Sequence, residues 1–386
     1  MTAPATPRPR RTRSAPSNGV AASSTRSRIP PPILVRQVRN GIEESVHRGD
    51  IVEVDTAGRV IRALGDPDRV VTLRSCVKPF GLTALIEAGG IDAFELEPHE
   101  LAIMASSHSG EDSHVRTIQG MLRRANLSQS LIATGSEGMP LDALTAARLA
   151  RDGEKAGAIR HMCSGQHTVS LLLSRLKGWD PTEYWHDDHP AQVAYRSAVA
   201  RAFGTVPERL VTAIDGCGLN TYAFPLREVA RAYALLADPD TVAARDPRAS
   251  VAEPLRVVRD AMLAHPEMVG GSHDRLDTSL VKALPGRIVS KAGMEALRGM
   301  AILAGPRGGK ETGASGLAVK IEDGDGYERG SWAASVEALR QAGVLDGQPL
   351  RMLARYHRPA ILDPHGRVGA EAIASFELAP VGELIR

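Results

Sequence analysis

A serine and a lysine three residues apart, Ser75 and Lys78, are the first side chains in the sequence whose types and spacing suggest covalent chemistry. A β-like run at 70–73 precedes them and an apolar helical pattern follows, so both should lie one turn apart at the start of a helix. A hydroxyl there lies near the positive end of the helix dipole, and a neutral lysine could take its proton. The alternative interpretation is a helix-capping serine beside a surface lysine.

A second polar cluster, Ser-Ser-His-Ser-Gly-Glu, occupies residues 106–111 between two predicted helices. Its hydroxyls, including those of Ser107 and Ser109, and the turn at Gly110 could donate hydrogen bonds to a ligand. The alternative is simple capping, because Ser109 or Asp112 can also accept the first N–H groups of the following helix.

Two separate cysteines follow, Cys163 in His-Met-Cys-Ser-Gly-Gln-His and Cys217 in Asp-Gly-Cys-Gly. With His167 or Asp215 nearby, they could form a zinc site of the open, catalytic kind. The alternative is that each cysteine is a small apolar residue buried in the core, which is the usual state of a lone cysteine.

A further lysine, Lys291, ends a predicted strand in the run Val-Ser-Lys-Ala-Gly. It could pair with a substrate carboxylate or hold a hydroxyl deprotonated, or it could be an ordinary edge-strand lysine. The run 305–311, Gly-Pro-Arg-Gly-Gly-Lys-Glu, looks like a phosphate loop. However, its spacing fails and Glu311 stands where Ser or Thr is required, so residues 305–316 are interpreted as a hairpin loop.

The elements that must position these residues follow from hydrophobic periodicity. Strands at both ends of the chain with helices between them predict an α+β architecture with an antiparallel or mixed sheet. We expect one domain over 33–386 with a helical insert at about 77–264. Strands are expected near 33–35, 50–54, 59–64, 70–73, 287–290, 300–303, 317–321 and 371–377. Helices are expected near 77–88, 98–106, 111–125, 141–151, 165–177, 189–203, 226–237, 250–264 and 331–343, with Pro98 and Pro190 at helix starts.

Charge is distributed unevenly along the 386 residues. Residues 1–32 hold six arginines and no acid, in a Pro- and Ser-rich composition that predicts a disordered tail. Removing them leaves 41 basic against 45 acidic groups, so the remainder has a net charge of about −4 and no overall nucleic-acid signature. Three cysteines cannot form a disulfide framework and fit a reducing cytoplasm. The sequence has no apolar run of the ~18 residues needed to span a bilayer.

Taken in order, these motifs resemble the asparaginase II family of the rhizobial type. The shared patterns are Ser-x-x-Lys, Ser-His-Ser-Gly-Glu, Cys-Ser-Gly-x-His, Asp-Gly-Cys-Gly and Lys-x-Gly-x-Glu, over about residues 33–380. The resemblance implies a fold like serine β-lactamases and penicillin-binding proteins, with helices around a mostly antiparallel central sheet. It also implies hydrolysis of L-asparagine to L-aspartate and ammonia by two Ser–Lys tandems, Ser75 with Lys78 and Ser107 with Lys291. Either serine could be the nucleophile, and we favour Ser75 because its base would lie in the same helix turn.

The family's zinc is held by two cysteines and a lysine. Cys163 and Cys217 match the thiolates, but the lysine position is Gln166, and an amide is a poor zinc ligand beside thiolates. We therefore expect zinc to bind weakly, to recruit His167 or water, or to be absent, and we expect no organic cofactor. The resemblance also implies that Asp215 holds the α-ammonium of the substrate. His167, Ser109, Gly110 and Gly293 would complete the substrate site.

Other functions stay open at this point. A glutaminase or a β-lactamase-like acyl transferase is the nearest alternative enzyme. The absence of a clear Ser-Asp-Asn motif, and a run at 290–293 that only approximates Lys-Thr-Gly, count against β-lactam chemistry. A non-catalytic amino-acid-binding protein is the alternative of another class, because of Gln166. We expect a cytoplasmic homodimer that acts on a small molecule and binds neither nucleic acid nor membrane.

Overall fold

The computed structural model describes residues 29–135, 139–326 and 328–381. The chain divides into Met1–Pro30 and Pro31–Arg386, and the description here concerns the second unit. The tail expected over residues 1–32 lies almost entirely outside the described residues, so its disorder stays a prediction.

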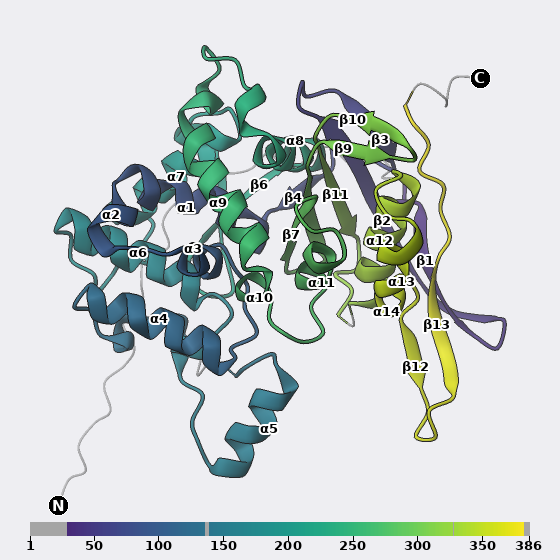
Figure 1. The fold of residues 1–386 in the computed structure, drawn as a ribbon, viewed down its shortest axis with the longest axis horizontal. Coiled ribbons are helices and arrows are strands. Elements are labelled where there is room, and N and C mark those ends of the chain that lie inside the picture. The colour runs from purple at the N-terminus through teal and green to yellow at the C-terminus, as the bar shows by residue number, and fades with distance from the viewer. Residues whose placement is uncertain (1–28, 136–138, 327, 382–386) are drawn as a thin grey trace, which may run out of the picture. The chain divides into compact units, whose positions relative to one another are not determined.

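A central antiparallel sheet is built from strands near both ends of the chain (Figure 1). Its strands follow the order β12-β13-β1-β2-β11-β8-β7, and β3 pairs with β2. The first and last strands in the sequence are neighbours, because Val35 of β1 pairs with Ala374 of β13. The bounds are β1 Ile33–Arg39, β2 Ile42–Asp55, β3 Val60–Leu64, β7 Ile288–Gly293, β8 Leu297–Ile302, β11 Ser315–Ile321, β12 Ala360–Leu362 and β13 Val368–Ala374.

Helices cover both faces of this sheet. On one face, α8 (Leu226–Ala237) lies directly on the strands, because a Cβ atom on Gly316 would be 1.9 Å from the carbonyl oxygen of Ala230. On the other face, α11 (Leu276–Ala283) and α12 (Arg329–Gln341) bury their apolar side chains against alternate residues of the same strands. The sheet is therefore the middle layer between two hydrophobic cores.

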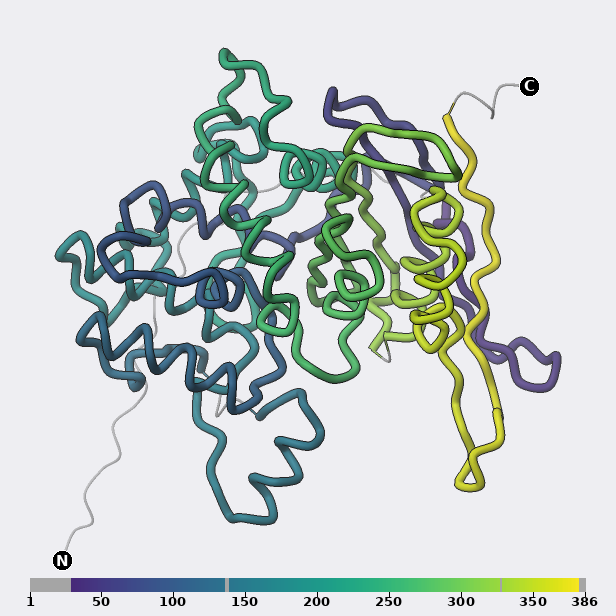
Figure 2. The backbone as a smooth tube through the Cα atoms, viewed as in Figure 1, coloured from purple at the N-terminus to yellow at the C-terminus, as the bar shows by residue number. Residues whose placement is uncertain are grey.

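The chain leaves this sheet after β3 and returns at β7, as the tube in Figure 2 traces. The intervening segment holds a smaller sheet in the order β4-β6-β5 and helices that pack on one another. The sequence did not predict strand β6. The bounds are β4 Val70–Thr72, α1 Lys78–Glu87, α2 Gly90–Phe94, α3 Pro98–Met104, α4 Asp112–Arg124, α5 Ala143–Asp152, α6 Ser164–Lys177, α7 Pro190–Ala202, β5 Val211–Ile214, β6 Asn220–Pro225, α9 Ala252–Ala264 and α10 Pro266–Val269.

The α+β class with a mostly antiparallel central sheet and surrounding helices is confirmed. Pro98 and Pro190 begin α3 and α7 as predicted, since the first turn of a helix does not need their N–H. The Gly-rich run forms a hairpin of β9 (Gly305–Arg307) and β10 (Lys310–Thr312), and α13 (Gly347–Met352) and α14 (Ala354–His357) precede β12. Within the described ranges, no helix has the length and apolar character that crossing a bilayer requires.

Candidate active site

Ser75 lies in a short 3₁₀ helix, η1 (Arg74–Val77), which runs directly into α1 at Lys78. Strand β6 holds the start of this turn, since the N–H of Leu73 donates to the carbonyl of Tyr222 at 2.8 Å. The next N–H, that of Arg74, donates to Thr221 Oγ1, also at 2.8 Å. The serine and lysine are 3% and 1% exposed, so the motif begins a buried helix, as predicted, and is not a surface cap.

The two lysines of the predicted tandems converge on one hydroxyl. Lys291 Nζ lies 2.9 Å from Ser107 Oγ, and Lys78 Nζ lies 3.2 Å from the same oxygen. Lys78 also donates to the carbonyl of Ser106 at 2.6 Å. Among the described residues, Ser75 Oγ has no hydrogen-bond partner, and Ser75 lines a cavity together with Ser107. The structure therefore brings Lys78 and Lys291 together at Ser107, and it places Ser75 on the wall of the same cavity.

Burial lowers the pKa of Lys291, one of the two lysines at Ser107. Complete burial, and then the charge of Lys78, lower the pKa of Lys291 to about 7. Near neutral pH, a substantial fraction of Lys291 is therefore a neutral amine. A neutral Lys291 can accept the proton of the Ser107 hydroxyl, which a charged ammonium cannot do.

A buried carboxylate fixes strand β7 on both sides of Lys291. Asp277 accepts hydrogen bonds from Ser290 Oγ at 2.6 Å and from the N–H of Ala292 at 3.0 Å, and it forms an ion pair with Arg298. Burial alone would raise the pKa of Asp277, but the charges of Arg298 and Lys291 outweigh burial and lower it to about 2. The carboxylate therefore stays ionised and holds the lysine's backbone in place.

Gly293 allows β7 to touch η1. A Cβ atom on Gly293 would lie 2.8 Å from the carbonyl oxygen of Leu73 and 3.1 Å from Cys76 Sγ. The Cys76 thiol in turn donates to the carbonyl of Lys291 at 3.2 Å. This close approach of two backbones places the Ser75 turn beside the lysine strand, so Gly293, a predicted site residue, lies where only a glycine fits without a shift.

The cavity at Ser75 and Ser107 has a volume of about 480 Å³. Its wall includes Arg275, which the sequence analysis missed. This guanidinium donates to the carbonyl of Ser107 at 2.9 Å and to Ser109 Oγ at 3.2 Å. A guanidinium at this position can bind a substrate carboxylate. The remaining lining residues are Leu141, Met162, His273, Asp274, Ala292–Arg298, Gly324–Gly326, Glu328, Ser331 and Trp332.

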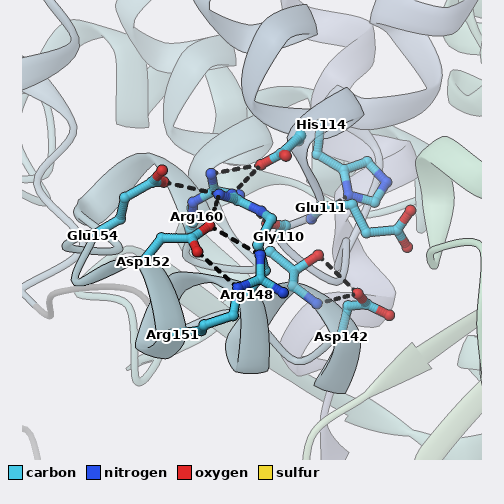
Figure 3. A network of polar contacts seen from close by, with 11 residues as sticks. Gly110, Glu111, His114, Asp142, Arg148, Arg151, Asp152, Glu154 and Arg160 are labelled. Atoms are coloured by element: carbon cyan, nitrogen blue, oxygen red, sulfur yellow. Dashed lines mark hydrogen bonds and ion pairs between the residues drawn. The ribbon is translucent and has the colours of Figure 1, made fainter.

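Ser109 and Gly110 form the turn behind the cavity. Ser109 Oγ donates to the carbonyl of Gly270 at 2.9 Å, and the carbonyl of Gly110 accepts from Arg160 at 2.8 Å. Figure 3 shows how Arg160 belongs to a network that also includes Arg148 from α5. Both arginines pair with Asp112 at the start of α4, at 2.6 Å and 3.0 Å. This network supports the turn, and neither Ser109 nor Gly110 is among the lining residues.

Asp215 and His167 also lie outside the described lining of this cavity. Asp215 Oδ1 accepts from Arg74 Nε at 2.6 Å, so it fixes the residue next to Ser75. His167 Nδ1 lies 2.5 Å from the Tyr184 hydroxyl, and burial lowers the pKa of His167 to about 3. A direct contact of either residue with substrate stays a prediction.

The two cysteines lie next to each other in the core, beside Lys78. The hydrogen bond with Cys217 does most to lower the pKa of Cys163, and the Lys78 ammonium, 3.3 Å from Cys163 Sγ, lowers it further. Gln166, at the family's lysine position, donates to the Tyr195 hydroxyl at 3.2 Å. The pKa of Cys163 is therefore lowered well below its usual value, although burial acts in the opposite direction.

These residues do not complete the three-ligand zinc site of the family. Over the described part of the chain, no His, Asp or Glu side chain joins Cys163 and Cys217 closely enough to share one ion. The donor set is two sulfurs, and catalytic zinc sites use three protein ligands. Among the described residues, the side chains close enough together to hold one metal ion are instead Glu111, Asp142 and His273. The two carboxylates of this group already accept hydrogen bonds.

Comparisons with known proteins identify a family. Residues 35–373 match the family described as L-asparaginase II. No curated protein matches the chain significantly.

Solved structures of low sequence identity are also similar. A crystal structure of Bacillus glutaminase in 4.3 M NaCl has a TM-score of 0.39 at 12% identity, over 77% of this chain and 92% of that one. The probable glutaminase from Bacillus subtilis, complexed with 6-diazo-5-oxo-L-norleucine, has a TM-score of 0.36 at 13% identity, over 77% and 84%. A crystal structure of Mglu has a TM-score of 0.35 at 15% identity, over 78% of this chain and 68% of that one. The chain spans 62% of the length of another Mglu structure.

Proposed function

The chain belongs to the L-asparaginase II family, and from that membership we propose that it hydrolyses the side-chain amide of L-asparagine to L-aspartate and ammonia. The observation that carries the proposal is the convergence of Lys78 and Lys291 on Ser107 Oγ, beside Ser75, in one cavity. An amidohydrolase needs a nucleophile, a base that is neutral at working pH and a path for protons between them. Ser75 supplies the nucleophile, Lys291 the base, and Ser107 the last hydroxyl of the proton path, which reaches Ser75 across the cavity that both serines line.

In the proposed mechanism, Ser75 Oγ attacks the amide carbonyl while its proton passes to Ser107 through a water molecule in the cavity, because no hydrogen bond joins the two hydroxyls directly. Ser107 hands its own proton to neutral Lys291, whose lowered pKa of about 7 suits it to this role better than Lys78, the base favoured from the sequence. The C–N bond then breaks, and Lys291 returns the proton through Ser107 to the leaving ammonia. Water hydrolyses the acyl-enzyme by the same proton path.

Substrate recognition is proposed to depend on the charges in the cavity wall. Arg275 would bind the α-carboxylate, since its guanidinium lies at the wall beside Ser107. The α-ammonium would face the acidic side chains Asp274, Glu295 and Asp325, which also line the cavity. This assignment replaces Asp215, whose carboxylate already pairs with Arg74.

Three measurements test this function against its alternatives. We would measure ammonia release from asparagine and from glutamine. In parallel, we would measure hydrolysis of a chromogenic β-lactam, with Ser75→Ala as the control for all three substrates. We expect turnover of asparagine above glutamine because the chain belongs to the L-asparaginase II family, and the preference should be about 10–200-fold, the range that one methylene gives. A preference for glutamine would make the protein a glutaminase. Calorimetric binding of asparagine without ammonia release would make it a binding protein.

We also propose a cytoplasmic location and a homodimer. The three cysteines are free and buried, which fits a reducing compartment. Strand β5 lies at the edge of the small sheet and exposes Val211 and Ile214, which are 53% and 81% exposed and suit a subunit contact. Sedimentation of the wild type against Ile214→Lys tests the dimer, because a buried charge would favour the monomer.

The metal is proposed to be weakly held. If zinc binds, Cys163 and Cys217 would hold it and water would complete its shell, because Gln166 is a poor ligand. When bound, such an ion would keep both cysteines as thiolates.

A further inference from the structure

A second cavity, of about 630 Å³, lies at the other end of strand β11 from the catalytic cavity. Ser315, which begins β11, lines this second cavity, whereas Gly324 and Asp325, which follow the strand, line the catalytic one. The two cavities have no lining residue in common among those described. The β2–β3 turn, the β9–β10 hairpin and the end of α12 form the walls (Figure 1).

Positive charge dominates this cavity. Four basic side chains line the described wall, namely Arg59, Arg62, Arg307 and Lys310, with Asp55 as the acid among them. A fully buried carboxylate, Glu53, lies behind them and pairs with both Arg62 and Arg307, each at 2.6 Å.

The ion pairs leave part of this charge uncancelled. The guanidinium groups of Arg62 and Arg307 both pair with the single charge of Glu53. Arg59 forms an ion pair with Asp55 at 2.8 Å. Within the described residues, the exposed Lys310 has no partner. The four basic side chains therefore exceed the two carboxylates by two positive charges. The low-dielectric wall of a cavity strengthens the electrostatic field of this net charge.

Arg307 is held rigidly at the inner end of this wall. Its side chain is 6% exposed, and its guanidinium donates to Glu53 and, at 2.8 Å, to Ser315 Oγ. Its Nε–H is buried and has no acceptor among the described groups. A buried donor without an acceptor is costly, so the protein itself does not fully satisfy this guanidinium.

Two of these cations come from the Gly-rich run 305–311, whose spacing does not match a phosphate loop. Its hairpin carries Arg307 on one strand and Lys310 on the next, with Gly308 and Gly309 at the tip. Both glycines have left-handed φ angles, of 54° and 78°, and no atom lies within 4 Å of a Cβ built on either. The N–H of Gly308 already donates to the carbonyl of Gly343 at 3.2 Å, so the hairpin supplies the cavity with its two cationic side chains and not with a free backbone donor at Gly308.

We propose that this cavity is a second binding site, separate from the catalytic one, for a small anion that carries carboxylate or phosphate groups. Arg59 and Lys310 provide mobile charge at the rim, and the Arg62–Glu53–Arg307 cluster provides fixed charge behind it. Guanidinium groups match both carboxylate and phosphate oxygens, so the two chemistries must be separated by experiment.

The test is calorimetric titration of the full chain with inorganic phosphate, and separately with succinate, at constant ionic strength. The wild type should bind at least one of them saturably. Replacing the rim charges in Arg59→Gln/Lys310→Gln should weaken binding about tenfold, because two charge-assisted contacts are lost. The matched control Arg209→Gln/Lys282→Gln removes the same charge from exposed positions elsewhere and should leave binding unchanged.

Binding must also be independent of the catalytic cavity. Arg275→Gln should therefore bind the same anion as tightly as the wild type. The proposal is overturned if neither anion binds the wild type, if the rim variant binds as tightly as the wild type, or if Arg275→Gln abolishes binding. Thermal unfolding of each variant checks that its fold is intact.

Discussion

Lys291 Nζ lies 2.9 Å from Ser107 Oγ, although the two residues are 184 positions apart in the chain. The contact joins strand β7 to the turn after α3. Because Lys78 reaches the same hydroxyl at 3.2 Å, the two Ser–Lys tandems are not independent pairs. They form one hydrogen-bonded network in which Ser107 connects the two lysines.

Removing each serine should have different effects. Ser75→Ala should reduce kcat to near the uncatalysed rate, because the attacking oxygen is lost. Ser107→Ala should reduce kcat about 10²-fold or more, because only proton transfer is impaired. Ammonia release measures both, and Ser250→Ala, an exposed serine, serves as a control. Near-normal kcat in Ser75→Ala would mean that Ser75 is not the nucleophile.

Activity should depend on the protonation of Lys291. Its pKa of about 7 predicts that kcat/KM rises about tenfold per pH unit below pH 7 and levels off above it, as the amine loses its proton. Lys291→Arg should abolish this rise of kcat/KM with pH and most of the activity, since a guanidinium stays charged. A profile that is flat between pH 6 and 8 in the wild type would contradict the assignment.

The same shift predicts a pH-dependent stability. The unfolded chain keeps Lys291 protonated up to its ordinary pKa of 10.5, whereas the folded protein releases the proton near pH 7. The unfolded state binds more protons between these values, so the free energy of unfolding should rise with pH there, by about 1.4 kcal/mol per unit. Lys291→Met should therefore stabilise the protein more at pH 6 than at pH 9. Urea unfolding at both pH values measures this, and an equal effect at both would argue against a buried, shifted lysine.

Zinc content should respond to the residue at position 166. We expect the purified wild type to hold well under one zinc per chain. Gln166→Lys should raise this toward one, because it restores a third ligand next to Cys163 and Cys217. Elemental analysis after dialysis gives the ratio, and adding Cys217→Ala to Gln166→Lys should abolish the gain. A full complement of zinc in the wild type would show that the two sulfurs suffice.

The glycine at the end of β7 should tolerate no side chain. Gly293→Ala would push β7 away from η1, because the added Cβ meets the backbone oxygen of Leu73 at 2.8 Å. We expect a loss of about 1–3 kcal/mol in stability and a larger loss in kcat, since Ser75 moves relative to Lys291. Gly120→Ala is the matched control, as its nearest neighbour would be 3.8 Å away. Unchanged kcat in Gly293→Ala would refute this role.

The sequence predicted the parts of the site that are carried by motifs. Ser75, Lys78, Ser107 and Lys291 were all chosen from local patterns, and the structure brings them together. Their grouping could be inferred only from the family resemblance, because a contact across 184 positions leaves no local signal. The long helices were equally predictable, since their periodicity extends over several turns.

The rest of the site depends on tertiary contacts. Arg275 lies between the loop 270–274 and α11, in a run of mixed charge, and nothing in this run marks it as part of a cavity wall. The pairing of Asp215 with Arg74 arises only when β6 and η1 meet, so the sequence could not show it, and the contact of Asp215 with substrate stays a prediction. Strand β6 itself is short and carries no clear alternation, so it was missed.

The pairing of β1 with β13 has a consequence for biosynthesis. Val35 leaves the ribosome long before its partner Ala374 is made, so the central sheet cannot be completed while most of the chain is being translated. Closing so long a loop is entropically costly and makes folding slow. The edge of β2 stays unpaired until β11 is made, and the edge of β1 stays open to other chains until β13 is made. Folding yield in the cell should therefore depend on chaperones that shield these edges, more than on the final stability of the enzyme.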